Sequence, residues 1–206
     1  MTVSISTVLL DADGVVQTTS PGWLDELAKL CGDPASSEAF LEEVFAAEGP
    51  ALNGSGHFRT ALAEVLARWN SPVGVEDALR VWQMIEPQTG VLEEAGRLRR
   101  AGVRVSLATN QQAERAAFMS RTLGYENQFD DLFYSFEIGH AKPDGAYFSA
   151  VLEQLDQPGK EVLFVDDNAK NVAAAQAVGL HARVYDLQTG RTGLTALLAE
   201  FGLGGA

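Results

Sequence analysis

Two carboxylates lie two positions apart at the end of an apolar run near the start of the chain. Residues 8–10 are followed by Asp11, Ala12, Asp13 and Gly14, so a buried strand is predicted to emerge into a loop here. Gly14 lets the backbone turn, and both carboxylates can then reach one site. One of them could act as a nucleophile in phosphoryl transfer while the other moves protons. Asp and Gly are also ordinary strand-ending and turn residues, so this segment alone leaves both interpretations open.

A second apolar run ends in a hydroxyl and an amide. Thr109 and Asn110 follow residues 105–108, and a helix is predicted to begin at Gln111. Hydroxyl and backbone N–H groups at the N-terminus of a helix hold phosphate oxygens. Either residue could instead serve only as the N-cap of that helix.

A lysine is held in the loop that covers residues 139–145. Pro143 stiffens the backbone beside Lys142, and Asp144 can start the next helix. A lysine fixed in this way could neutralise both a nucleophilic carboxylate and a phosphate as a compact positive charge. A lone lysine is usually a solvated surface residue, so a structural alternative exists here too.

Two adjacent acids end a further apolar run. Asp166 and Asp167 follow residues 162–165 and precede a predicted helix. Helix capping explains one acid more easily than two, because like charges at the end of an apolar strand repel unless a cation lies between them. Mg²⁺ fits such oxygen ligands and completes its octahedron with water and substrate phosphate.

The elements that must position these residues alternate along most of the chain. Because helix-length amphipathic segments lie between the later strand-like runs, the pattern predicts a doubly wound α/β fold with a mainly parallel, Rossmann-like sheet. Ligands bind beyond the carboxyl ends of such strands, so the four segments are expected to share one rim. The strand-like runs cover residues 5–10, 103–108, 132–136, 162–166 and 182–185, and the helical segments cover 111–123, 144–155 and 168–178.

The interval 17–88 breaks this alternation. It shows no convincing strand, but helical periodicity appears near 22–31, 36–47, 57–69 and 75–85, with breakers that include Gly49-Pro50. We therefore predict a catalytic core formed by residues 1–16 and 89–206 and an inserted helical cap formed by residues 17–88. Since the insertion follows Asp13 and Gly14 directly, the cap should lie over whatever the first strand presents.

Composition limits the classes of partner. The 206 residues carry a net charge of −13, which argues against nucleic acid and anionic membranes as partners. No apolar stretch approaches the length of a membrane span, and the N-terminus does not resemble a signal peptide, so we expect a soluble cytoplasmic protein, a monomer or homodimer. Cys31 is the only cysteine, which excludes an internal disulfide and a thiolate metal site.

The four motifs together resemble those of the haloacid dehalogenase-like hydrolase superfamily, specifically its phosphatase-type members with a helical cap inserted after the first motif. The motifs read D-A-D-G-V from residue 11, A-T-N from 108, A-K-P from 141 and V-D-D-N from 165. The likeness extends over nearly the whole chain. In the cap it rests only on position, size and helical character.

The resemblance implies a role for each motif residue. Asp11 would be the nucleophile that forms an aspartyl-phosphate, and Asp13 the general acid and base. Lys142 would orient Asp11, offset its charge and help to bind phosphate. The remaining implied contacts are phosphate binding by Thr109 and Asn110, and Mg²⁺ binding by Asp11, the backbone carbonyl of Asp13, Asp167 directly and Asp166 through a water, although Asp166 and Asp167 could exchange roles.

The predicted function is Mg²⁺-dependent hydrolysis of a small phosphorylated metabolite, with a sugar phosphate as one candidate. Asp13, Asp166 and Asp167 oppose a dehalogenase, because dehalogenases of the superfamily generally lack these acids. A phosphomutase with the same core motifs remains an alternative, as does a binding module that has lost turnover. Cap residues should select the substrate, although Trp23, Trp69 and Trp82 fall on helical faces typical of a hydrophobic core.

Overall fold

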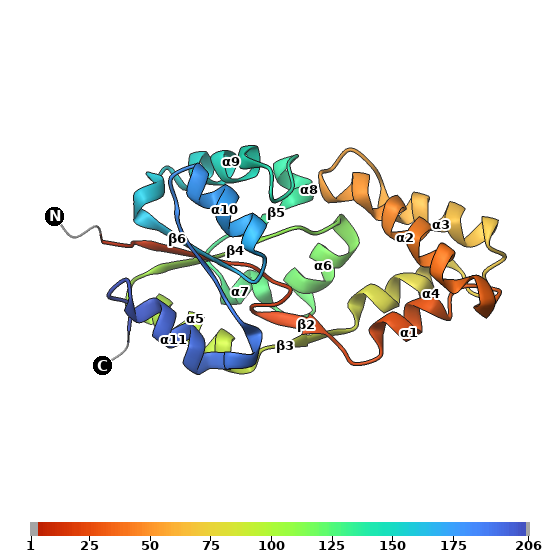
Figure 1. The fold of residues 1–206 in the computed structure, drawn as a ribbon, viewed down its shortest axis with the longest axis horizontal. Coiled ribbons are helices and arrows are strands. Elements are labelled where there is room, and N and C mark those ends of the chain that lie inside the picture. Colours follow the sequence, from red (N-terminus) through yellow and green to blue (C-terminus); the bar gives the residue numbers. More distant parts are fainter. Residues whose placement is uncertain (1–3, 205–206) are drawn as a thin grey trace.

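The computed structural model describes residues 4–204, and its centre is a five-stranded parallel sheet (Figure 1). β1 lies in the middle of this sheet, paired with β4 on one side and β6 on the other. The first strand after the start of the chain is therefore flanked by strands from its second half. The strand order is β5 (Leu132–Tyr134), β4 (Arg104–Thr109), β1 (Thr7–Leu10), β6 (Val162–Asp166) and β7 (His181–Val184).

Helices cover both faces of the sheet. Because successive side chains of a strand point to opposite faces, Val8 and Leu10 of β1 pack into one hydrophobic cluster and Leu9 into another. The Leu9 face is covered by α9 (Gly145–Leu155) and α10 (Ala169–Ala177). The opposite face is covered by α5 (Thr89–Arg100), α6 (Ala113–Arg121), α7 (Tyr125–Gln128) and α11 (Gly190–Ala199).

The doubly wound α/β prediction is confirmed. Each of the five predicted strand runs overlaps a strand of this sheet, and each of the three predicted core helices is present. The sequence pattern did not predict α5 and α11, which cover the sheet on the side of Val8 and Leu10. Short helices complete the core: α8 (Ser135–Ile138), η3 (Gly159–Glu161) and η4 (Leu187–Thr189).

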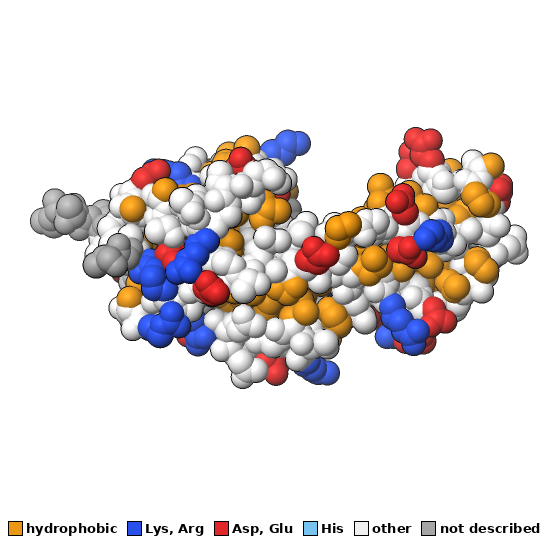
Figure 2. Space-filling view, turned by 90° about the horizontal axis from the view of Figure 1, so that it is seen from below, with side chains coloured by type: hydrophobic (Ala, Val, Ile, Leu, Met, Phe, Trp, Pro, Cys, Tyr) orange, Lys and Arg blue, Asp and Glu red, His pale blue; other side chains and the backbone are white. Residues whose placement is uncertain are grey.

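The helices between β1 and α5 form a second lobe with its own hydrophobic core. Phe40, Leu62 and Trp82 are buried in a cluster that contains no residue of the five-stranded sheet, and Trp23 and Trp69 pack against it. The three tryptophans are thus core residues, as the sequence indicated. Figure 2 shows this lobe beside the sheet domain. Its helices are α1 (Trp23–Ala28), η1 (Pro34–Ser36), α2 (Ser37–Leu52), α3 (Phe58–Arg68), α4 (Val75–Leu79) and η2 (Arg80–Gln83).

Two expectations for the interval 17–88 were wrong. Its ends form a two-stranded antiparallel ribbon of β2 (Gln17–Thr19) and β3 (Ile85–Pro87), which connects the two lobes. These strands are too short to produce an alternating pattern. In addition, α2 continues through Gly49 and Pro50. Pro50 lies in the last turn, where its missing N–H costs a single helical bond, and its carbonyl accepts bonds from Ser55 and Gly56.

The boundaries of core and cap at 16/17 and 88/89 stay a prediction. Residues 1–3 and 205–206, the outer ends of the predicted core, lie outside the described residues. Cys31 is buried in the cap. Among residues 4–204, no helix combines the length and the apolar character needed to cross a membrane.

Candidate active site

The carboxyl ends of three neighbouring strands carry the polar residues singled out in the sequence. Asp11 follows β1, Thr109 ends β4 and Asp166 ends β6, and these strands are adjacent in the sheet. Helix capping does not account for these residues. The side chain of Gln112 caps α6, and that of Asn168 caps α10.

Lys142 joins the first and last of these strand ends. Its ammonium group lies 2.8 Å from Asp11 Oδ1 and 2.7 Å from Asp166 Oδ2, and it donates a third bond of 2.9 Å to the carbonyl of Ala108. Lys142 is buried, so it is not a solvated surface lysine. All three N–H donors of the ammonium are used, and loss of Lys142 would leave two buried carboxylates unpaired, which typically costs about 3–5 kcal/mol.

The two adjacent acids after β6 have different surroundings. Asp166 is fully buried, and both of its oxygens accept bonds: Oδ1 from the backbone N–H of Asn168 at 2.7 Å, Oδ2 from Lys142, and each from Asn171. Asp167 is exposed. Its carboxylate is therefore the more available of the two for a ligand.

Asp11, Asp166 and Asp167 form a group that could hold a cation. One carboxylate oxygen from each lies within 4.8 Å of the others. Burial raises the pKa of Asp11 to about 7, the neighbouring charge of Asp166 adds to this, and Lys142 opposes it. Burial and Asp166 also raise the pKa of Asp167. Oxygen ligands that resist ionisation next to one another fit a hard divalent cation such as Mg²⁺, which would stabilise their charged forms.

Gly14 allows the first loop to approach the acids after β6. Its φ is +86°, and a Cβ placed there would lie 2.3 Å from Asp167 Oδ2. A residue with a side chain would therefore meet both backbone strain and a collision with Asp167. The D-x-D-G motif has its glycine because the loop and the carboxylate of Asp167 are in close contact.

Asp13 lies in a network that the sequence analysis missed. Arg115 binds both of its oxygens, with Nη2 at 2.8 Å from Oδ1, while Gln111 and Gln17 donate bonds of 2.8 Å and 3.0 Å. Burial raises the pKa of Asp13, but these bonds and the charge of Arg115 outweigh it and hold the pKa below its ordinary value. The one signal in the sequence was a charged residue on the apolar stripe of α6, which also carries Ala116 and Met119.

Asn110 and Thr109 lie between these groups. The carboxamide of Asn110 donates 2.8 Å to the carbonyl of Lys142 and accepts 2.8 Å from its backbone N–H. It thereby fixes the Lys142 loop against the end of β4. The hydroxyl of Thr109 is buried beside the amide of Gln111, at 3.4 Å. Phosphate binding by Thr109 and Asn110 stays a prediction, and one of the two N–H donors of the Asn110 amide is already used in the bond to Lys142.

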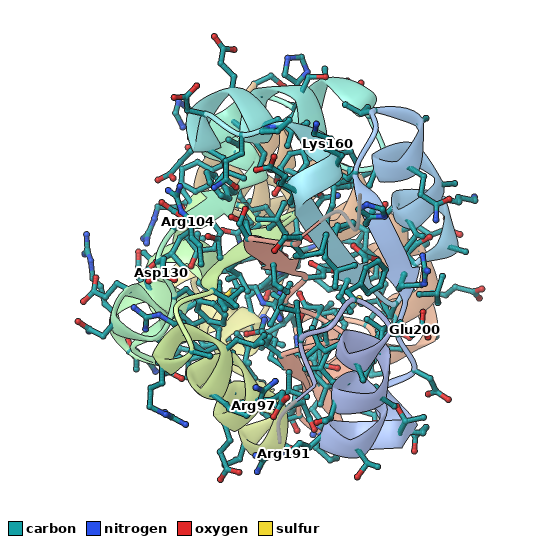
Figure 3. All side chains as sticks on the ribbon, turned by 90° about the vertical axis from the view of Figure 1, so that its left-hand side faces the viewer. Arg97, Arg104, Asp130, Lys160, Arg191 and Glu200 are labelled. Atoms are coloured by element: carbon teal, nitrogen blue, oxygen red, sulfur yellow. The ribbon has the colours of Figure 1, made fainter. Side chains whose placement is uncertain are left out.

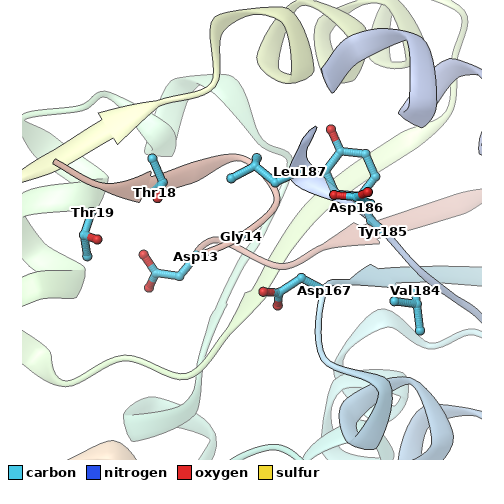
Figure 4. A pocket seen from close by; sticks show the side chains of 9 residues that line it. All are labelled: Asp13, Gly14, Thr18, Thr19, Asp167, Val184, Tyr185, Asp186 and Leu187. Atoms are coloured by element: carbon cyan, nitrogen blue, oxygen red, sulfur yellow. The ribbon is translucent and has the colours of Figure 1, made fainter. Parts of the chain in front are cut away.

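A hollow of about 610 Å³ opens beside Asp13 and Asp167 (Figure 4). It extends from the first loop to β2 and to the segment after β7, and Asp13, Asp167 and Asp186 give it an acidic lining. Its other lining residues are Gly14, Thr18, Thr19, Val184, Tyr185 and Leu187.

Comparison with known proteins shows which family the chain matches. The family model described as haloacid dehalogenase-like hydrolase matches residues 5–179. A phosphorylated carbohydrates phosphatase of Thermotoga maritima is 25% identical over 86% of this chain and 83% of its own. The sesquiterpene phosphatase astK of Aspergillus oryzae is 41% identical over 93 residues, which is 45% of each chain. The match therefore covers less than half the length of that relative.

A solved structure shares the fold. It is a HAD family enzyme from Bacteroides thetaiotaomicron in complex with magnesium and inorganic phosphate, with a TM-score of 0.74 and 24% identity over 89% of this chain and 95% of that one. This similarity supports the architecture of sheet and inserted helices.

Proposed function

The chain belongs to the haloacid dehalogenase-like hydrolases, and we propose that it is a Mg²⁺-dependent phosphatase that hydrolyses a small phosphate monoester through an aspartyl-phosphate on Asp11. The observation that carries the proposal is the convergence of Asp11, Lys142, Asp166 and Asp167 within hydrogen-bond or ligand distance of one another. A site for binding alone has little need for a nucleophile that is backed by a second, proton-handling acid. The relatives named as phosphatases support the same reaction class.

Asp11 offers one free oxygen for the attack. Its Oδ1 is bound by Lys142 at 2.8 Å and by the backbone N–H of Ala12 at 2.7 Å. Among the described residues, none donates a hydrogen bond to Oδ2, so Oδ2 is the atom that would bond to phosphorus. Lys142 fixes the rotamer of Asp11 and stabilises its charged form, which is the form that can attack.

Asp13 would handle the protons in both steps. In the first step the bond from Asp11 to phosphorus forms, the ester bond breaks, and the protonated form of Asp13 gives its proton to the leaving alcohol. That form is a minority in the free protein, because Arg115 holds the pKa of Asp13 low. In the second step Asp13 takes a proton from water as the water attacks phosphorus, and Asp11 leaves as a carboxylate. Thr109 would bind the oxygens of the transferring phosphoryl group.

Asp11, Asp167 and the backbone carbonyl of Asp13 would hold Mg²⁺, with Asp166 in support. The bound ion supplies charge compensation for the phosphoryl oxygens. Among the described residues, Lys142 is the one cationic side chain that contacts both Asp11 and Asp166.

The hollow beside Asp13 indicates where the alcohol part of the substrate would lie. A leaving oxygen protonated by Asp13 must adjoin that carboxylate, and the hollow begins there. None of its nine described lining residues is a lysine or arginine, whereas three are aspartates. Such a lining disfavours a second negative charge on the substrate, so we propose an uncharged alcohol, such as a sugar or another small polyol.

The test is release of inorganic phosphate from a panel of phosphate esters, with Mg²⁺ and with EDTA. Mg²⁺-dependent release that Asp11→Asn abolishes would support the proposal. Ligand binding with no turnover in any condition would favour a binding module. Movement of phosphate between positions of one sugar, with none released, would identify a phosphomutase.

A further inference from the structure

Arg115 connects the proton-handling acid to the cap. It is largely buried on α6, and its guanidinium binds both oxygens of Asp13, the side-chain oxygen of Gln111 at 3.0 Å and the backbone carbonyl of Trp82 at 3.0 Å. Trp82 belongs to η2, at the end of the helical segment. One planar group thus joins the first loop, the segment after β4 and the cap.

The cap side of this connection is rigidly packed. The ring of Trp82 lies edge-on against Phe58 with a centroid distance of 4.8 Å, and its indole N–H donates 2.9 Å to Glu48 of α2. The carbonyl that accepts from Arg115 is therefore fixed by both the ring and the indole N–H of its own residue. The cap gives Arg115 one bond that the sheet domain cannot supply.

We propose that Arg115 is a positioning residue for Asp13. Arg115 holds the accessible edge of the Asp13 carboxylate toward the leaving group, and the Trp82 carbonyl of the cap accepts a further hydrogen bond from the guanidinium of Arg115. The proposal rests on the proposed phosphatase function. A bidentate guanidinium fixes the plane of a carboxylate more strictly than a single donor does. Gln17 and Gln111 also donate to this carboxylate, but the side chain of Asp13 is still 41% exposed and lines the hollow, so a leaving group in the hollow can reach it. Arg115 itself keeps its protons and touches no reacting atom.

The first test compares two leaving groups. Glycerol phosphate has a poor leaving group that needs a proton, whereas nitrophenyl phosphate releases a stable phenolate without one. Arg115→Met should lower kcat for glycerol phosphate about 30-fold or more, a substantial part of the roughly 10²–10⁴ that positioned proton transfer supplies. The rate of the pre-steady-state burst of nitrophenolate should change less than about 3-fold, since this leaving group departs without needing a proton from Asp13.

The matched control is Arg121→Met, which removes an exposed arginine from the end of the same helix. It should leave both substrates unaffected. An equal loss for both leaving groups in Arg115→Met would assign Arg115 a general structural role and overturn the proposal.

The second test asks whether Arg115 acts through Asp13. If it does, Asp13→Asn combined with Arg115→Met should be no slower than Asp13→Asn alone. A double variant in which the two losses multiply would overturn the proposal. If Arg115→Met does not fold, as judged by thermal unfolding, the same cycle is run with Arg115→Lys, which keeps the charge and loses the paired donors. Failure of the phosphatase function is separate, because the unmodified protein would then release no phosphate from either ester.

Discussion

The two ends of the same parallel sheet differ in how their acidic side chains are paired with basic ones. At the amino end, two neighbouring acids each have their own base: Asp131 pairs with Arg104 at 2.7 Å and Asp130 with Arg99 at 2.8 Å. Arg104 and Asp130 are labelled in Figure 3. At the carboxyl end, two cations serve four acids. Lys142 contacts Asp11 and Asp166, Arg115 contacts Asp13, and Asp167 has neither as a partner.

This difference separates charges that serve the fold from charges that serve the chemistry. Partly exposed pairs such as those at the amino end contribute about 0–1 kcal/mol each, and their charges cancel locally. At the carboxyl end the excess of negative charge raises the pKa of Asp11 and Asp167, with burial as the larger cause. A group of carboxylates that raise one another's pKa values is typical of a site that binds a cation.

The largest expected effect comes from removing the nucleophile. Asp11→Asn should lower phosphate release by about 10³-fold or more, because a covalent step cannot be replaced by the remaining groups. Its thermal unfolding should change little, since Lys142 keeps Asp166 and the Ala108 carbonyl as partners. The measurement is phosphate release with a parallel melting curve.

Asp131→Asn provides the matched control at the opposite end of the sheet. It removes a carboxylate that binds Arg104 and Ser106, so it should lower the melting temperature and leave kcat/KM unchanged. Full activity in Asp11→Asn, or loss of activity in Asp131→Asn, would contradict the division between the two ends.

A second prediction concerns the unpaired acid. Asp167→Asn should raise the Mg²⁺ concentration that gives half-maximal activity by about 10-fold or more, because one anionic ligand is lost. Folding should be nearly unaffected, since Asp167 is exposed. A titration of activity with Mg²⁺, from EDTA-treated protein, measures this. An unchanged Mg²⁺ requirement would mean that Asp167 does not bind the metal.

A third prediction uses the acidic hollow. Glycerol phosphate has a hydroxymethyl group where phosphoglycerate has a carboxylate. The kcat/KM for glycerol phosphate should be roughly 10-fold higher, because repulsion between the carboxylate of phosphoglycerate and the acidic lining costs about 1–2 kcal/mol in a partly solvated site. Leu187→Lys adds a positive charge to the lining and should narrow this preference. Equal rates for both esters would place the alcohol elsewhere.

The carboxyl-end motifs could be predicted from the sequence because parallel strands bring their ends together whatever the intervening chain does. Asp11 and Asp166 each lie at a strand end, and Lys142 lies in the loop between α8 and α9 beside a stiffening proline, so local patterns were sufficient. Arg115 gave no such pattern. Its partners Asp13 and Trp82 are 102 and 33 residues away, and only the packing of the cap against α6 brings them together.

The smallest expected effect lies at this junction, where Glu48 of α2 accepts the indole N–H of Trp82 at 2.9 Å. Burial raises the pKa of Glu48 in the folded protein, although Arg115 opposes this. A carboxyl group with a raised folded-state pKa lowers stability once it ionises. The penalty is absent below the unfolded-state pKa, where Glu48 is protonated in both states, and grows as pH rises through the folded-state pKa.

Glu48→Gln keeps an acceptor for Trp82, so its melting temperature should be close to that of the unmodified protein at low pH and a few degrees higher at alkaline pH. Glu42→Gln, at an exposed position of the same helix, should show no such divergence. If Glu48→Gln were instead less stable than the unmodified protein at alkaline pH, the attraction between the charges of Glu48 and Arg115 would outweigh the cost of burial. The cap would then be joined to the site by charge as well as by the Trp82 carbonyl.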